Sequence, residues 1–275
     1  MAVDPTSTKA RWMSPAAAAG FARRLQARGH YGFALQELLK ETGLSPAAAK
    51  GQLHRLAPGI VPFYPRSFFY LIVPPEHLAI GAPPVTWWID DFFAIRAQPY
   101  YLGLLTAAAH HGSSHEAPQM IQIVTDRPLN PVRLGRQKIV FVTKKSAAET
   151  PAVRATGGQA PFQVSTAEAT LLDLLYYPEH VGGLARIAEL ARDLKPKLSG
   201  KGLRQALDQP LDTALLQRAG FLLEALGLES ESRIVDRALK GRRRRPTALE
   251  AGTLPKGEPD PRWRVTGSLP ELESG

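Results

Sequence analysis

The sequence contains no cysteine and no long apolar run, and each absence excludes a class of structure. Without cysteine the chain can form neither disulfides nor thiolate metal sites, which is typical of proteins in a reducing compartment. Because no window approaches ~18 uninterrupted apolar residues, we expect no transmembrane helix. The residues up to Trp12 include Asp4 and lack an apolar segment, so they do not resemble a secretory signal. We therefore expect a cytoplasmic protein.

The chain does contain enough apolar residues for folded domains, and its charge is unevenly distributed. At 275 residues, 44% of them apolar, it is long enough for two domains. Residues 1–75 hold nine Lys/Arg against three Asp/Glu, residues 76–239 hold 17 of each, and residues 240–275 hold eight against five. Positive charge gathered at the two ends indicates a polyanion-binding module, although a solvated basic surface would give the same counts.

The N-terminal region has the spacing of three short helices. The first lies in "SPAAAAGFARRLQARG" and the second in "GFALQELLKETG", where Gly43 ends the helix. The third runs from about Pro46 to Ala57, with Ser45 as its N-cap. The third helix should bury three residues at i, i+4 and i+7: Ala49, Leu53 and Leu56.

Two β-rich runs follow the helices, at Ile60–Tyr64 and Phe68–Val73, around the turn sequence "PRS". This pattern predicts a hairpin with Arg66 at its tip. Three short helices and a hairpin are typical of a winged helix-turn-helix, which we place at residues 10–75. We therefore expect a DNA-binding domain, with a winged helix used for protein contacts as the alternative.

The N-terminal part of the third helix is the segment that such a domain inserts into the major groove. Its outward side chains are few, and Lys50 and Gln52 are the polar groups best suited to base edges or phosphate. Ser45, at the start of the helix, suits a phosphate. The full set of expected DNA-binding residues is Arg23, Arg24, Ser45, Lys50, Gln52, His54, Arg55 and Arg66.

The rest of the chain divides by composition into a connector at residues 76–95, a folded domain at 96–239 and a tail at 240–275. In the folded domain we expect a helix at Tyr100–His111, then strands, then a helix in "TAEATLLDLLYY". From Gly183 to Gly227 the pattern is again helical, with a break at "KPKLSGKG". Strands that precede helices predict an α+β domain. The expected strands are Met120–Thr125, Lys138–Thr143 and "APFQVS". The fold class is therefore α+β: an N-terminal winged helix-turn-helix followed by a mixed α+β domain.

The tail is rich in glycine, proline and charge, so we expect it to be basic and partly extended. Its densest charge is "KGRRRR", Lys240–Arg245, which could contact nucleic-acid phosphate or stay solvated.

Enzymatic motifs are weak. The histidines of "HHGSSHE" lack the spacing of metal ligands, since His110 and His111 point about 100° apart on a helix. Asp126 with Lys138 or Lys144 imitates a nuclease centre only faintly, and there is no phosphate loop or Gly-x-Ser-x-Gly. We expect no enzyme, no cofactor and no metal.

Three segments in order, "PYYLGLLTAAAHHG", "VSTAEATLLDLLYYPEHVGG" and "AGFLLEALG", follow the expected winged helix. Together they resemble the AbiEi family, the antitoxins of type IV toxin–antitoxin systems. The resemblance covers most of residues 10–235. It implies that the winged helix binds inverted repeats in the promoter of its own operon and represses it, and that the C-terminal domain counteracts a nucleotidyltransferase-like toxin without a stable complex. The protein is then expected to be a monomer in solution that assembles cooperatively on double-stranded DNA.

By position, the resemblance maps the C-terminal helix motif to a stretch that includes Glu168 and Asp173. Family members often have Glu-Arg-Thr there, whereas this chain has Glu168-Ala169-Thr170. Arg218 is a further candidate, for a basic surface of the second domain. A purely structural role for the motif remains open, as do two other functions of the chain: a stand-alone winged-helix regulator and a nuclease-like enzyme.

Overall fold

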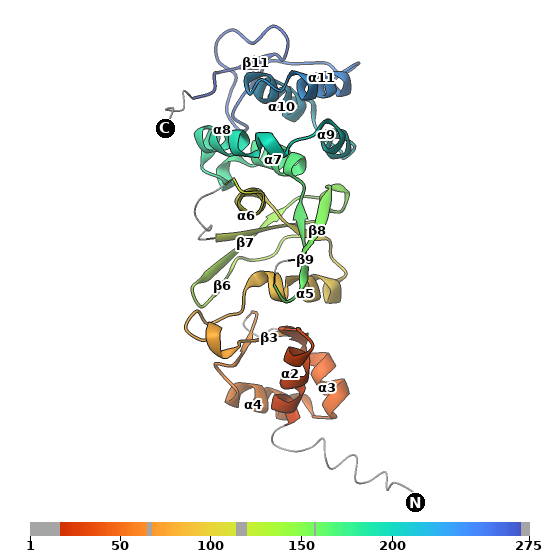
Figure 1. The fold of residues 1–275 in the computed structure, drawn as a ribbon, viewed down its shortest axis with the longest axis vertical. Coiled ribbons are helices and arrows are strands. Elements are labelled where there is room, and N and C mark those ends of the chain that lie inside the picture. Colours follow the sequence, from red (N-terminus) through yellow and green to blue (C-terminus); the bar gives the residue numbers. More distant parts are fainter. Residues whose placement is uncertain (1–16, 65–67, 114–119, 157, 271–275) are drawn as a thin grey trace, which may run out of the picture. The chain divides into compact units, whose positions relative to one another are not determined.

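The computed structural model describes residues 17–64, 68–113, 120–156 and 158–270. The fold is mixed α and β (Figure 1), as the expected fold class requires. The chain forms two compact units, and each is built from three segments. Unit 1 comprises Met1–Pro99, Leu129–Val140 and Arg154–Gln163, and unit 2 comprises Tyr100–Pro128, Phe141–Val153 and Val164–Gly275.

From residue 17 on, unit 1 contains helices and a small antiparallel sheet in the order β1-β3-β2. Its apolar core includes Phe21, Leu38, Ala49 and Leu53, so the predicted inward face of the third helix is confirmed at its first two positions. Leu56, the third, is only partly buried. The elements in chain order are α2 (Ala17–Ala27), β1 (Gly32–Ala34), α3 (Leu35–Thr42), α4 (Pro46–Arg55), β2 (Ile60–Pro62) and β3 (Phe69–Ile72).

The predicted start of the second helix was wrong, because Gly32–Ala34 form strand β1 instead. This strand pairs with β3, and the Phe69 ring lies where a Cβ at Gly32 would stand. Pairing with a distant strand therefore overrides the local helical pattern. The predicted end of the helix at Gly43 is confirmed: this glycine has φ 68° and its N–H donates to the Leu39 carbonyl.

Residues 76–95, predicted as a connector, contain folded elements and lie in unit 1. Trp88 and Phe92 are buried there and meet the rings of Phe63 and Phe69 edge to face or tilted. This aromatic cluster extends the core of unit 1 beyond the small sheet. The elements are the short 3-10 helices η1 (Pro75–His77) and η2 (Val85–Trp87) and the helix α5 (Ile89–Arg96).

A six-stranded sheet has the order β6-β7-β5-β4-β9-β8. The helix predicted over Tyr100–His111 was wrong at its start, because Tyr100–Leu102 form strand β4, which pairs antiparallel with β5. The helix α6 (Leu104–His110) begins only after Gly103. A short apolar run is compatible with a helix or a strand, and here pairing with β5 makes it a strand. The other strands are β5 (Met120–Thr125), β6 (Val132–Leu134), β7 (Gln137–Thr143), β8 (Ala152–Thr156) and β9 (Pro161–Ser165).

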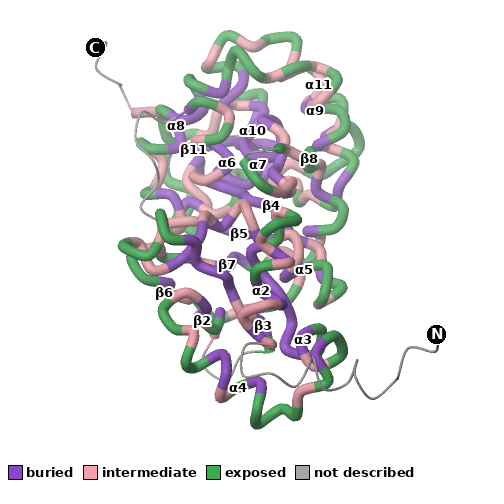
Figure 2. The backbone as a smooth tube through the Cα atoms, turned by 60° about the horizontal axis from the view of Figure 1, so that its bottom comes forward, coloured by how far each residue is buried: buried purple, intermediate pink, exposed green. Residues whose placement is uncertain are grey.

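Outside its strands, unit 2 is mainly helical. Its core is formed largely by α7 and α10, whose tube is mostly purple in Figure 2. None of the described helices combines the length and apolar character needed to span a bilayer. The elements are η3 (Ala147–Glu149), α7 (Ala167–Tyr176), η4 (Pro178–His180), α8 (Gly183–Leu194), η5 (Lys195–Lys197), α9 (Gly200–Leu207), α10 (Thr213–Ala225) and α11 (Glu229–Ala238).

The tail is packed more closely than its composition indicated. Strands β10 (Thr247–Ala248) and β11 (Val265–Thr266) pair in parallel, and Trp263 between them is only 1% exposed. The Trp263 ring occupies the place where a Cβ at Gly220 would stand, so a glycine on α10 makes room for it.

Candidate functional site

The first candidate site is the outer face of α4. Ser45 caps this helix, as predicted: its Oγ accepts a hydrogen bond of 3.3 Å from the Ala48 N–H, and Pro46 occupies the first turn. Lys50, His54 and Arg55 are exposed on the same helix. The structure therefore leaves two permanent cations and one histidine of α4 open to a ligand.

Gln52 does not belong to that face, and its assignment as a base-reading residue is corrected. It is 6% exposed, and its Oε1 accepts a hydrogen bond of 2.9 Å from the backbone N–H of Ala18 at the start of α2. Because the first N–H groups of a helix lack partners within that helix, the amide completes α2 from another element. Gln52 is a structural residue.

The basic residues of α2 differ in their surroundings. Arg23 is exposed, whereas Arg24 forms an ion pair of 2.6 Å with Glu41 of α3. Both partners of that pair are about two-fifths exposed, so its contribution to stability is small. Arg66, expected at the tip of the wing, lies outside the described residues.

Beside α4 the surface of unit 1 is hollowed. A pocket of about 430 Å³ lies between α4 and the strands β2 and β3. Lys50 and His54 contribute to its wall, together with Leu53, Ile60 and the half-buried Tyr70. Lys50 and His54, exposed on α4, thus border a concave, partly apolar surface.

The second candidate site surrounds Asp173 of α7 in unit 2. The Asp173 carboxylate, 2% exposed, accepts a hydrogen bond of 2.7 Å from the Tyr101 hydroxyl and forms an ion pair of 2.7 Å with Lys144 Nζ. Burial and then the neighbouring Asp173 charge raise the pKa of Tyr101 well above its ordinary value. Tyr101 therefore stays protonated and donates, and the buried carboxylate is satisfied by two groups.

The Lys144–Asp173 pair lines a pocket of about 670 Å³. Tyr176 and Tyr177 from the end of α7 also line it, in edge-to-face contact with ring centroids 4.7 Å apart. Its volume lies within the range typical of small-molecule sites. The remaining lining residues are Thr143, Lys145, Ser146, Glu149, Pro210, Leu211, Asp212 and Leu215. Sequence reasoning missed this pocket, since its residues are far apart in the chain.

Glu168 holds the start of α9 and does not face solvent. It is 5% exposed, and its Oε1 accepts from both the backbone N–H and the hydroxyl of Ser199, at 2.9 and 3.0 Å. A Cβ at Gly202 would strike this carboxylate, so the glycine admits it. The contacts of Glu168 are those of a structural residue.

Arg218 is not part of a basic surface, and that expectation is corrected. It is 9% exposed on α10, and its guanidinium donates to the Ala248 carbonyl at 2.9 Å and to the Thr247 hydroxyl at 3.2 Å. Burial lowers its pKa from the ordinary value. A guanidinium used this way fastens the tail strand β10 to α10.

Two of the residues considered for catalysis, Asp126 and Lys144, are engaged elsewhere. Asp126 pairs with its neighbour Arg127 at 3.4 Å, and Lys144 pairs with Asp173. His111 Nε2 lies 2.7 Å from the Ser165 carbonyl, whereas the end of "HHGSSHE", from residue 114, is outside the described residues. In the part of the chain that the structure describes, no three His, Cys, Asp or Glu side chains cluster as metal ligands would.

Comparison with known proteins places this geometry in context. The family model described as AbiEi antitoxin C-terminal domain matches residues 101–225, a range that includes Tyr101, Lys144 and Asp173. Among solved structures, the chain is similar to the RV2827C protein from Mycobacterium tuberculosis, with a TM-score of 0.63 and 19% sequence identity over 93% of this chain and 90% of that chain. At this identity the likeness shows the fold alone. No curated protein matches the chain. The resemblance expected from the sequence is thereby confirmed for residues 101–225, which match the AbiEi antitoxin C-terminal domain.

Proposed function

We propose that this protein is the antitoxin of a type IV toxin–antitoxin system and that it represses its own operon. Unit 1 acts as a winged helix-turn-helix on inverted repeats of the promoter, and the AbiEi domain counteracts a nucleotidyltransferase-like toxin. The observation that carries this proposal is the match of residues 101–225 to the AbiEi antitoxin domain. Both activities are binding functions, and neither requires catalysis or a cofactor.

The DNA-binding role is supported by the order of elements in unit 1. Helix α3 ends at Gly43, α4 follows after the cap Ser45, and β2 and β3 pair antiparallel after α4. In the DNA-bound form of this motif, the helix in the position of α4 enters the major groove with its N-terminal end. Lys50 then reaches guanine or phosphate, while the exposed Ala47 and Ala48 lie within reach of thymine methyl groups.

Direct reading of bases by α4 is sparse, since Gln52 is buried and its amide is used by α2. The exposed polar side chains of α4 are Lys50, His54 and Arg55, and cations bind phosphate as readily as bases. Sequence specificity therefore comes mainly from the use of two half-sites and from the shape and deformability of the promoter DNA.

The antitoxin role is assigned to the AbiEi domain as a folded surface and not to Glu168, Asp173 or Arg218 as contact residues. All three side chains are buried and hydrogen-bonded within unit 2. Contact with a partner must then come from exposed groups, among which Lys145 and Tyr176 lie on the rim of the large pocket.

Two assays on the full chain test the proposal. A gel shift on the DNA upstream of its own gene should show retardation that Lys50→Ala combined with Arg55→Ala reduces. Co-expression with the neighbouring toxin gene should rescue growth, and the same double variant should still rescue. An adjacent gene that encodes no nucleotidyltransferase, together with intact DNA binding, would leave a stand-alone regulator. Absence of retardation at low salt would contradict the DNA-binding half.

A further inference from the structure

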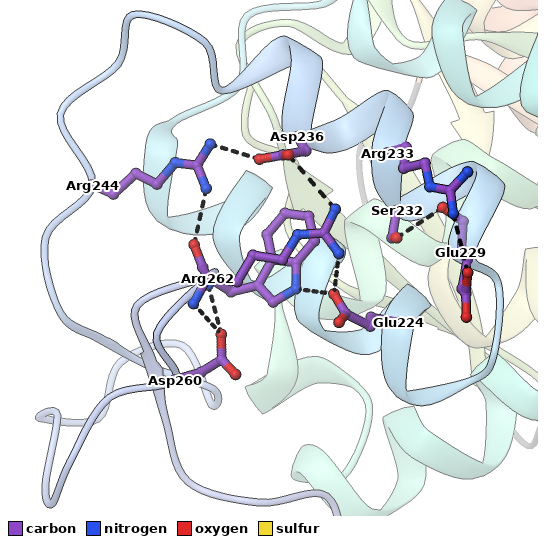
Figure 3. Close-up of polar contacts among 9 residues, drawn as sticks. Glu224, Glu229, Ser232, Arg233, Asp236, Arg244, Asp260 and Arg262 are labelled. Atoms are coloured by element: carbon purple, nitrogen blue, oxygen red, sulfur yellow. Dashed lines mark hydrogen bonds and ion pairs between the residues drawn. The ribbon is translucent and has the colours of Figure 1, made fainter.

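The basic run Lys240–Arg245 follows α11, and the structure separates one of its arginines from the rest. Arg244 is turned inward: it forms an ion pair of 2.7 Å with Asp236 of α11, and it donates to the Arg262 carbonyl at 2.9 Å (Figure 3). Arg262 in turn pairs with Glu224 at 2.9 Å, and its guanidinium lies 4.7 Å from the Trp263 ring centroid. Arg244 therefore ties the run to the helices α10 and α11.

The backbone of the run is fixed at a second point. Gln217, buried on α10, donates from Nε2 to the carbonyl of Arg245 at 2.9 Å, and from the same atom to the Trp263 carbonyl at 2.6 Å. Arg242 donates to the Leu211 carbonyl at 2.8 Å. A run held at three of its residues presents its exposed side chains in a defined arrangement, unlike a free tail.

The exposed cations of the run form what we call the basic loop: Lys240, Arg242, Arg243 and Arg245. Arg242 uses one N–H for the Leu211 carbonyl and keeps its other donors for a ligand. All four are exposed, and none forms an ion pair with another described residue. Lys240 lies close enough to the C-terminus of α11 to interact with its dipole, but that effect falls off within the last turn and leaves Arg243 and Arg245 without such a role. Four like charges held in a fixed loop repel one another, so an anionic partner would stabilise them.

We propose that the basic loop binds the phosphate backbone of duplex DNA without regard to sequence. The planar guanidinium groups of three arginines match phosphate oxygens in a two-pronged geometry. Recognition of single strands requires exposed aromatic rings on which bases stack. The basic loop has none, and the nearby Trp263 is buried. The surface therefore suits a double-stranded backbone, and it gives unit 2 a DNA contact in addition to the one proposed for α4.

The test is the salt dependence of binding by the full chain, measured by fluorescence anisotropy on a labelled duplex of scrambled sequence. The variant combines Arg243→Ala with Arg245→Ala, because neither side chain forms a hydrogen bond or ion pair with the residues that the structure describes. Loss of two phosphate contacts should make the negative slope of log affinity against log salt less steep by about 1.8. At salt concentrations between about 50 and 200 mM, the variant should bind roughly tenfold or more weakly than the wild type. The melting temperature should not fall.

The matched control combines Arg192→Ala with Arg204→Ala, which removes the same charge from exposed positions on α8 and α9. The proposal is overturned if the two double variants bind the scrambled duplex equally well, if the wild-type chain does not bind it at low salt, or if the Arg243/Arg245 variant loses only toxin neutralisation. Failure of the promoter hypothesis is recognised separately, as equal affinity of the wild type for promoter and scrambled duplexes.

Discussion

The side-chain oxygen of Gln52 on α4 accepts a hydrogen bond from the backbone N–H of Ala18 near the start of α2. The helix proposed to enter DNA is thus joined, through a buried amide, to α2. The contact fixes α4 against α2 in addition to the apolar packing of Ala49 and Leu53.

Replacing Gln52 by methionine keeps a side chain of similar length but removes the acceptor. The Ala18 N–H is then buried without a partner, and we expect the free energy of unfolding to fall by about 1–3 kcal/mol in urea denaturation. The control Gln36→Met changes an exposed glutamine of α3 and should alter stability by less than about 0.5 kcal/mol. If the two substitutions changed the free energy of unfolding equally, the structural role of Gln52 would be contradicted.

How much of this site the sequence could predict depends on how far away each partner lies. The cap Ser45, the helix end at Gly43 and the buried Leu53 follow from patterns within a few residues, and the structure confirms them. Gln52 and Arg218 were placed on the surface because their partners, Ala18 and Ala248, are about 30 residues away along the chain. A sequence pattern within a few residues cannot predict a contact of this kind.

The same limit explains the misassigned strands and the missed pocket. Tyr100–Leu102 is apolar enough for a helix, and only its pairing with β5 makes it a strand. The ion pair of Lys144 and Asp173 joins residues 29 positions apart, so neither stood out as half of a buried pair. Tertiary pairing, absent from any local window, decides both.

For DNA binding, we expect affinity to fall steeply with salt. If about five to eight phosphates are neutralised, the log–log slope should be roughly −4 to −7 per bound protein, and Lys50→Ala should reduce its magnitude by about 0.9 without loss of thermal stability. Anisotropy titrations at several salt concentrations measure the slope. An affinity that does not change with salt would contradict the electrostatic account.

Leu53→Ala should instead lower the free energy of unfolding by ~2–5 kcal/mol, because Leu53 is a core residue.

In unit 2, the Lys144–Asp173 pair should show strong energetic coupling. Lys144→Met leaves a carboxylate that is 2% exposed without its cation, which should cost about 3–5 kcal/mol. Asp173→Asn added to that variant should restore part of the loss, since the buried charge is then gone. A double-mutant cycle by chemical denaturation measures the coupling, expected at about 0.5–3 kcal/mol. Additive effects would mean that the pair does not stabilise the fold.

At alkaline pH, Tyr101 should make the fold less stable. Its pKa is raised in the folded state above the ordinary value of 10.0, so the unfolded chain releases this proton first. The contribution of Tyr101 is therefore constant below about pH 10 and is lost as pH rises above it. Tyr101→Phe should make the fall in unfolding free energy less steep over that range, as measured by chemical denaturation at several pH values. A slope equal to that of the wild-type chain would contradict the assignment.

Gly220 should tolerate no side chain. A Cβ at this position would overlap the Trp263 ring, so Gly220→Ala must displace either the ring or α10. We expect a loss of about 1–3 kcal/mol, the usual cost of overpacking. Tryptophan fluorescence should report the displacement. Gly51→Ala is the control, because this helical glycine of α4 has room for a Cβ, whose nearest neighbour would be the Arg55 side chain at 3.7 Å. Unchanged stability of Gly220→Ala would mean that the tail is not anchored through Trp263.

The path of the chain through its two units has a consequence for how the gene can be divided. Unit 1 is completed only by Leu129–Val140 and Arg154–Gln163, both of which lie within the span of the AbiEi match. A stop codon after Pro99 would therefore remove part of unit 1 as well as the whole of unit 2. Exchange of the N-terminal region between related genes would carry the same penalty, since a recombinant must inherit compatible segments at three places. The two proposed activities are thus inherited as one block, and point substitutions, not truncations, are the means to separate them.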